Sequence, residues 1–112
     1  MQVKYFKRIF DEVSAAAESD PIYNLSSDVL AVQIDGTFSA ISFKVFGKVT
    51  KESENFVELS AINLNSFTAA SEITAKGIYE IAVEGICGLK FQIASISGGN
   101  ATVDIRLVST GN

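Results

Sequence analysis

The residues that most often carry out nucleophilic and acid–base chemistry are scarce in this chain. Its 112 residues include no histidine and one cysteine. A serine, cysteine or threonine nucleophile needs an adjacent general base, which is most often a histidine. Ser-His-Asp and Cys-His arrangements are therefore excluded, and no motif points to the Ser-Lys pair that remains formally open. The sequence gives no catalytic residue, and we expect a protein that is not an enzyme.

The one cysteine, Cys87, lies between Ile86 and Gly88. A single cysteine cannot form an internal disulfide, and one cysteine without histidine cannot build a zinc site. A reactive thiol would need a neighbouring cation or histidine, whereas a free cysteine is usually a buried small hydrophobe. We therefore predict that Cys87 packs as an apolar side chain.

Carboxylates are the remaining groups that could bind a cation. Glu52 and Glu54 flank a loop, and Asp28 and Asp35 lie at expected strand ends. None of the four shows the alternating-oxygen spacing of a calcium loop, so solvated surface charges are the favoured interpretation. The sequence predicts no metal site.

Glu80 and Glu84 share the outer face of one expected strand. Glycoside hydrolysis needs two carboxylates fixed at a set separation in a cleft, and these two are better explained as edge-strand or surface charges. The glycines lie in turns, and no glycine-rich loop leads from a strand into a helix to hold a phosphate. We therefore expect no cofactor.

The charge balance argues against two classes of partner. The net charge is −4, and the one basic cluster, Lys4, Lys7 and Arg8, is followed by Asp11 and Glu12. Nucleic-acid binding depends on basic patches that neutralise phosphates, so we expect no nucleic-acid partner. The apolar runs are far shorter than the ~20 residues that span a bilayer, so we expect no membrane partner. Residues 1–10 lack the apolar stretch of a signal peptide, which predicts folding in the cytoplasm of the cell that makes the protein.

Strand periodicity dominates the chain from Asp28 onward. Leu30, Val32 and Ile34 alternate with polar or small residues and lead into the tight-turn pair Asp35-Gly36. Further alternating segments lie at residues 41–49, 56–59 with an extension toward 64, 79–83, 89–95 and 103–107, and one short strand is expected near 71–74. Such alternation suits antiparallel sheets with one buried face. The pattern predicts an all-β antiparallel sandwich or small barrel.

The N-terminal segment is ambiguous. Apolar residues between positions 3 and 17 fit a helical stripe, but several of them also fit a broken strand alternation. Pro21 ends either element and predicts an extended entry into residues 22–25. The size of the chain and its 47% apolar content predict one domain over residues 1–112, in which residues 1–20 are an arm, a short helix or a first strand.

Three aromatic residues are candidates for an interface. Phe46 falls on the polar face of its expected strand, and Phe38 and Phe67 lie near loops. An aromatic side chain in such a place is either covered by a loop or exposed to a partner, and ordinary packing is the favoured interpretation.

Nearly the whole chain, from about Phe6 to Ser109, resembles small virion proteins of tailed bacteriophages and prophages. The resemblance rests on residues 10–15, 28–38, 43–49, 56–59, 61–64 (AINL), 73–79 (ITAKGIY), 83–85, 89–91 and 97–103 (SGGNATV). It implies a jelly-roll-like sandwich of about eight strands that serves as a virion part, and it favours a strand at the N-terminus. Many such proteins carry a DG-x-x-W stretch where this chain has residues 51–56, so no ligand preference of that loop transfers.

The resemblance leads to two functional hypotheses. The first is a homo-oligomeric structural protein of the virion, such as a capsid decoration, head-fibre or tail-accessory protein, assembled in the bacterial host cytoplasm on capsid or tail proteins. Residues 1–8 are its candidate docking arm. The alternative is a module of a phage tail or baseplate that binds a receptor or surface glycan. Sugar stacking needs exposed Trp or Tyr, and only Tyr5, Tyr23 and Tyr79 are available, with Tyr79 expected to be buried.

Overall fold

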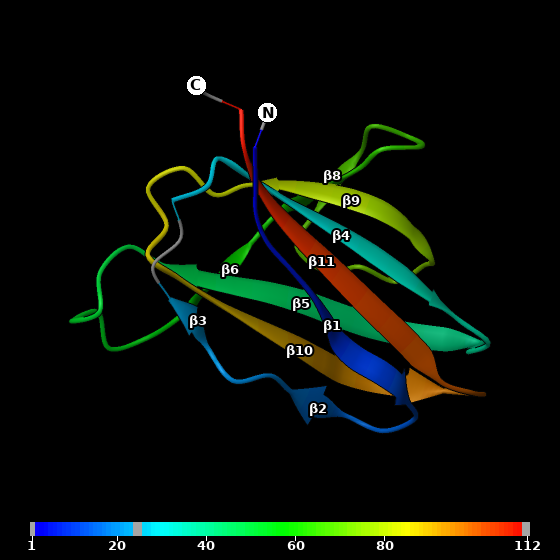
Figure 1. The fold of residues 1–112 in the computed structure, drawn as a ribbon. Coiled ribbons are helices and arrows are strands. Elements are labelled where there is room, and N and C mark those ends of the chain that lie inside the picture. Colours follow the sequence, from blue (N-terminus) through cyan, green and yellow to red (C-terminus); the bar gives the residue numbers. More distant parts are fainter. Residues whose placement is uncertain (1, 24–25, 111–112) are drawn as a thin grey trace.

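Alternating apolar residues build two antiparallel sheets that pack face to face (Figure 1). The computed structural model describes residues 2–23 and 26–110. Within them the strands are β1 (Gln2–Val13), β2 (Ala17–Glu18), β3 (Ile22–Tyr23), β4 (Val29–Gly36), β5 (Ala40–Lys48), β6 (Val57–Leu59), β7 (Ala61–Asn63), β8 (Ala69–Ala70), β9 (Gly77–Ala82), β10 (Gly88–Ser97) and β11 (Ala101–Ser109). The predicted all-β antiparallel sandwich is confirmed.

The strands are divided between two sheets of a sandwich. The first sheet has the order β1-β11-β4-β9-β7-β8, and the second has the order β2-β10-β5-β6 with β3 also paired to β10. The chain passes repeatedly from one sheet to the other, so that strands from both ends of the sequence lie side by side. The described residues hold eleven strands where about eight were expected, because β2, β3 and β8 are two-residue additions.

The core lies between the sheets and follows the predicted alternation. Leu30, Val32 and Ile34 of β4 are fully or almost fully buried. Phe43 of β5 lies at the centre, with its ring edge-to-face against Phe10 of β1 and stacked on Phe91 of β10, at 6.4 Å between centroids in both cases. These contacts join the two sheets in one hydrophobic core.

The N-terminal segment is a strand, and its irregular pairing explains why its sequence pattern is ambiguous. β1 pairs with β11 from Gln2↔Ser109 to Val13↔Ala101, with register shifts between Val3 and Tyr5, between Arg8 and Phe10 and between Phe10 and Val13. Each shift changes which residues face the core, so the apolar residues depart from strict alternation. The structure therefore has a first strand in place of the helix or free arm that the sequence left open.

Two connections differ from the expected strands. The predicted continuous run from Phe56 toward Leu64 is divided, because β6 lies in the second sheet and β7 in the first. The short strand expected near residues 71–74 is a single bridge, in which Ile73 pairs with Phe43 through two backbone hydrogen bonds of 2.9 Å. Ile73 is buried at this bridge and belongs to the hydrophobic core.

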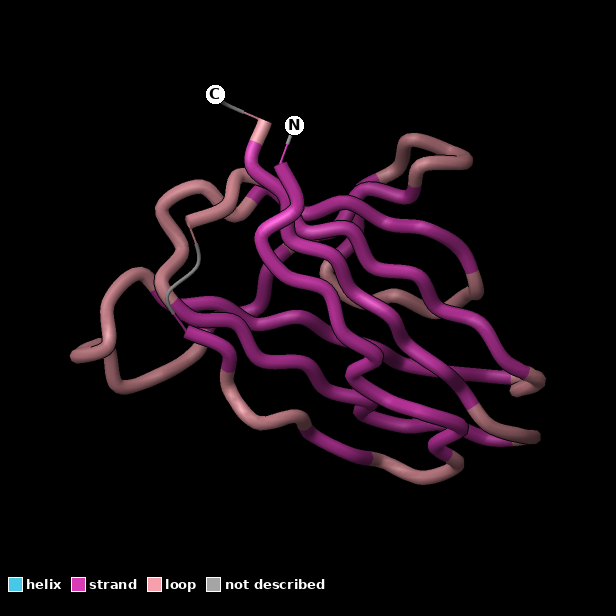
Figure 2. Tube along the Cα trace, in the orientation of Figure 1, coloured by secondary structure: helices cyan, strands magenta, loops and turns pink. Residues whose placement is uncertain are grey.

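Strands and loops alone make up the described chain (Figure 2). None of its residues belongs to a helix long and apolar enough to cross a membrane. The extended entry predicted after Pro21 is present as β3, and residues 24 and 25 of that prediction lie outside the described part.

Candidate interaction surface

The carboxylates considered for cation binding are exposed or serve the fold. Asp28 accepts hydrogen bonds from the backbone N–H and the hydroxyl of Thr110, both at 2.9 Å, and Asp35 accepts one from the N–H of Gly36 at 2.8 Å. Glu52 lies at an exposed position of the loop before β6. Among residues 2–23 and 26–110, no group of three or more acidic, cysteine or histidine side chains could hold a metal ion.

The structure separates Glu80 from Glu84; both are exposed, as the surface-charge interpretation predicted, but the edge-strand interpretation is wrong. Glu80 lies on β9, which is an inner strand between β4 and β7, whereas Glu84 follows the end of β9. Cys87 is half-buried rather than buried, and its N–H donates a hydrogen bond to the carbonyl oxygen of Lys48 at 2.8 Å.

The solvent-facing side of the first sheet carries several exposed apolar residues. We call it the outer face. Cross-strand pairing builds a middle row that runs, from β1 to β8, through Phe6, Arg106, Ala31, Glu80, Ile62 and Ala69. Phe6 is 72% exposed at one end of this row, and Ile62 is 45% exposed near the other.

A second row of the outer face is wholly aliphatic. It consists of Val3, Val108, Val29 and Ala82, which pair in that order across four strands. On the opposite side of the middle row lie Gln33 and Ile78, and Ile78 is 48% exposed. Large apolar side chains on a sheet face that lacks a covering layer are typical of an interaction surface.

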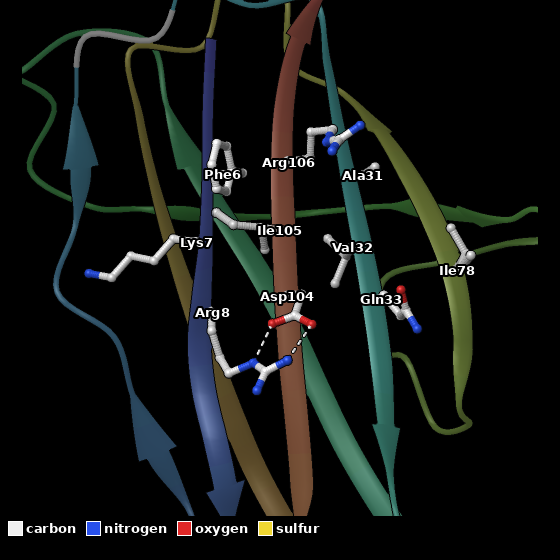
Figure 3. Close-up of a pocket in the computed structure, with 10 residues that line it drawn as sticks. All are labelled: Phe6, Lys7, Arg8, Ala31, Val32, Gln33, Ile78, Asp104, Ile105 and Arg106. Atoms are coloured by element: carbon white, nitrogen blue, oxygen red, sulfur yellow. Dashed lines mark hydrogen bonds and ion pairs between the residues drawn. The ribbon is translucent and has the colours of Figure 1, made fainter. Parts of the chain in front are cut away.

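A shallow hollow of about 490 Å³ lies in the outer face between Phe6 and Ile78 (Figure 3). Its floor includes Ala31, whose small side chain leaves room between the larger residues on either side. Arg106 extends from β11 over β4, beside Ala31.

An ion pair fixes one border of the hollow. Arg8 of β1 donates from Nε to Oδ1 of Asp104 at 2.8 Å and from Nη2 to Oδ2 at 3.2 Å. These hydrogen bonds, with the charge of Asp104, raise the pKa of the Arg8 guanidinium above its ordinary value. Arg8 and Asp104 therefore satisfy each other, and they form a polar rim beside the apolar residues.

The solvent-facing side of the second sheet has a different character. Lys44 of β5 pairs with Glu58 of β6 at 3.1 Å, and Lys90 of β10 pairs with Glu18 of β2 at 2.6 Å. The predicted outward aromatic on this side, Phe46, is half-buried. Mutually paired charges favour contact with water, so the outer face of the first sheet is the stronger candidate for a partner.

Tyr23, an exposed tyrosine considered for sugar stacking, has two lysines against its ring. Tyr23 lies against Phe56 with ring centroids 6.5 Å apart, and the Nζ atoms of Lys48 and Lys51 lie 5.3 and 5.6 Å from the Tyr23 ring centre. Tyr79 is buried, as predicted. Cation–π contacts of this kind engage the Tyr23 and Phe56 rings within the chain, so neither ring is a free aromatic platform.

Phe67, at the turn between β7 and β8, is the most exposed large apolar residue among those described, at 77%. Its backbone has a φ of 58°, and the turn is held by the N–H of Phe67 on the carbonyl oxygen of Asn63 at 2.7 Å. The third candidate aromatic, Phe38, packs against the core. Of the three aromatics, Phe67 is the one that the structure leaves open to solvent.

Comparison with known proteins finds this fold in solved structures. No family model matches the chain, and no curated protein matches it in sequence. Two solved structures share its fold. The SPBc2 prophage-derived protein YomS has a TM-score of 0.81 at 20% identity over 94% of this chain and 92% of YomS. The PBSX exported protein XepA has a TM-score of 0.85 at 22% identity over 94% of this chain and 37% of XepA. The chain thus spans nearly the whole of YomS and little more than a third of XepA.

Sequence reasoning did not single out Phe6 and Ile78. Phe6 belongs to the ambiguous N-terminal segment, where neither face could be assigned. Ile78 did carry a signal, because it is out of phase with Tyr79 and Ile81 and so had to point away from the core.

Proposed function

We propose that this chain is a non-enzymatic structural protein of a bacteriophage or prophage particle, and that it attaches to the capsid as an oligomeric decoration or head accessory protein. The observation that carries the proposal is the apolar outer face on a fold shared with a prophage-derived protein, YomS. A particle protein needs a rigid body and a surface that holds it to its neighbours. The two-sheet core supports the first requirement, and the exposed apolar residues of the outer face support the second.

Attachment by an oligomer suits a surface of this size. The middle row of the outer face is interrupted by Arg106 and Glu80, so a single copy offers limited dry contact area. Several linked copies that bind a repetitive lattice at once gain affinity by multivalency, because each later contact is intramolecular. In this proposal the chain folds in the bacterial host cytoplasm and joins the virion there.

The test is recovery with particles from a host that carries the corresponding phage. Particles and tailless heads are purified on density gradients, and the chain is quantified against the major capsid protein by mass spectrometry. A fixed ratio in both fractions is expected. Recovery with tails alone would contradict capsid decoration, and recovery in the medium free of particles would contradict a virion role altogether.

A Phe6→Ser variant sharpens this test, with Glu58→Arg as its control. Phe6 lies on the outer face, whereas Glu58 lies on the charged side of the second sheet. We expect Phe6→Ser to lower the ratio and Glu58→Arg to leave it unchanged. The alternative of a receptor- or glycan-binding module would gain support from specific hits on a glycan array that are lost on changing Tyr23.

A further inference from the structure

The middle row of the outer face has a charge pattern that is complementary to itself. Ala31 of β4 lies at the centre, with Arg106 on one neighbouring strand and Glu80 on the other. Beyond them lie Phe6 on β1 and Ile62 on β7. The row therefore reads apolar, positive, small, negative, apolar.

Neither charge is neutralised by another described residue of its own copy. In the described part of the chain, Arg106 and Glu80 take part in no ion pair. Asp104, the acidic residue nearest to Arg106 along β11, is already engaged by both Arg8 hydrogen bonds. Arg106 is instead directed over β4, toward the side of the sheet where Glu80 lies (Figure 3).

We propose that the outer face binds a second copy of this chain, with Arg106 of each copy paired to the partner's Glu80. A two-fold axis that lies in the interface, parallel to β4, places β11 of one copy over β9 of the other. The two charged pairs then form together, and Phe6 meets the partner's Ile62. Ala31 lies at the axis, where its small side chain permits close approach of the sheets.

The charge pattern selects this arrangement over the other face-to-face packing. An in-plane two-fold axis perpendicular to the strands would place Arg106 over the partner's Arg106 and Glu80 over the partner's Glu80, and like charges in an interface oppose association. Packing of two sheet faces with their strands nearly aligned is a common geometry, since sheet twist allows it. In the aliphatic row Val108 is already buried and Val29 half-buried, so Val3 and Ala82 are the members that add exposed apolar surface beside the charged pairs.

This inference rests on the oligomeric part of the proposed function, but its test uses purified protein without particles. Mass is measured by light scattering and sedimentation over a range of concentrations. We expect an even-numbered assembly, weakened about tenfold or more in dissociation constant by Arg106→Glu or Glu80→Arg alone. The combined Arg106→Glu and Glu80→Arg variant restores association, because the charges exchange places across the interface.

Glu58→Arg is the matched control, since it makes the same chemical change on the other sheet and should leave association unchanged. Far-UV circular dichroism verifies that every variant is folded. A monomer at all concentrations, an odd-numbered ring, or a combined variant that stays as weak as the single ones would overturn the proposal. If the monomeric protein still joins particles through Phe6, the self-association proposal and the oligomeric part of the proposed function both fail, whereas the virion role itself stands.

Discussion

Phe67 occupies a left-handed backbone conformation at φ 58° while its ring remains 77% exposed to solvent. Such a conformation costs a non-glycine residue about 1–2 kcal/mol, and an exposed ring returns little of that by burial. The hydrogen bonds of Asn63 to the N–H groups of Asn65 and Ser66, at 2.8 and 3.3 Å, keep the turn in place. A residue that is costly to the fold and open to solvent is a candidate for contact with a partner.

Phe67→Gly is therefore expected to raise the free energy of unfolding by about 0.5–1 kcal/mol, since glycine adopts positive φ without a Cβ penalty. Urea unfolding followed by circular dichroism measures the change. Phe67→Ala removes the ring but keeps the backbone cost, so its stability should stay close to that of the parent. A loss of stability in the glycine variant would show that the ring packs more than its exposure indicates.

Tyr79 makes stability depend on pH in the alkaline range. Burial raises the pKa of the Tyr79 hydroxyl above its ordinary value near 10, and the hydroxyl donates a hydrogen bond to the carbonyl oxygen of Ala75 at 2.8 Å. The folded protein thus retains a proton that the unfolded chain releases above about pH 10. The stability contributed by this group is complete below the unfolded pKa and is lost as the pH rises through the raised folded pKa.

Tyr79→Phe separates this effect from the titration of lysines. At about pH 8 the variant should be less stable by about 1 kcal/mol, because the hydrogen bond to Ala75 is lost. The difference between the two proteins should shrink as the pH rises from about 9 to about 11. Chemical unfolding at several pH values measures it, and a difference that stays constant with pH would contradict the role assigned to Tyr79.

At the scale of strands, the pairing of β4 with β11 ends at a point where the backbone of Gly36 lies very close to the backbone of Asn100. Gly36 ends β4 opposite Ala101 at a φ of 142°, and a Cβ added there would lie 2.2 Å from the carbonyl oxygen of Asn100. That oxygen accepts the N–H of Thr37 at 3.0 Å. Gly85, by contrast, has a φ of 86° but open space around its added Cβ.

The two glycines offer a matched pair of substitutions. Gly85→Ala should cost about 1 kcal/mol, for the backbone conformation alone. Gly36→Ala should cost about 3 kcal/mol or more, because the backbone penalty is joined by a clash that only movement of the turn can relieve. Thermal or urea unfolding of both variants tests the difference. Equal decreases in the free energy of unfolding would mean that the backbone at Asn100 moves away from the added Cβ at little cost.

Strand positions could be predicted from the sequence where pairing is regular and could not where it is bulged. Leu30, Val32 and Ile34 keep strict alternation because β4 pairs with β11 and β9 without a shift. In β1 the register shifts beside Tyr5 and Phe10 move side chains off the period-two pattern, which made a helix look equally suitable. The segment is a strand because it pairs with β11, which lies at the other end of the chain.

The composition of the outer face could not be predicted from the sequence. Its middle row takes Phe6, Arg106 and Ile62 from strands that are far apart in the chain, so their adjacency exists only once the strand order is known. The sequence does indicate which residues point outward on regular strands, as for Glu80. It does not indicate which outward residues of different strands become neighbours.

Across the whole molecule, the sandwich is asymmetric in what its two sides present to solvent. One side is balanced by the pairs Lys44–Glu58 and Lys90–Glu18, and the other carries Phe6 and Ile78. The two sheets nevertheless depend on the same core, because Phe43 of the second sheet packs on Phe10 of the first. The two sheets are therefore expected to unfold together, so that binding at the outer face also stabilises the charged side.

Phe43→Ala tests that linkage. The ring is fully buried between Phe10 and Phe91, so its removal should lower the free energy of unfolding by about 3–5 kcal/mol. Loss of both sheets should still occur in one transition, with far-UV circular dichroism and tyrosine fluorescence changing together, because neither sheet keeps a core of its own. Phe46→Ala on the opposite side of the same strand is the control, and its half-buried ring should cost about 1 kcal/mol. Two separate transitions in the Phe43→Ala variant would show instead that each sheet can hold part of the core without the other.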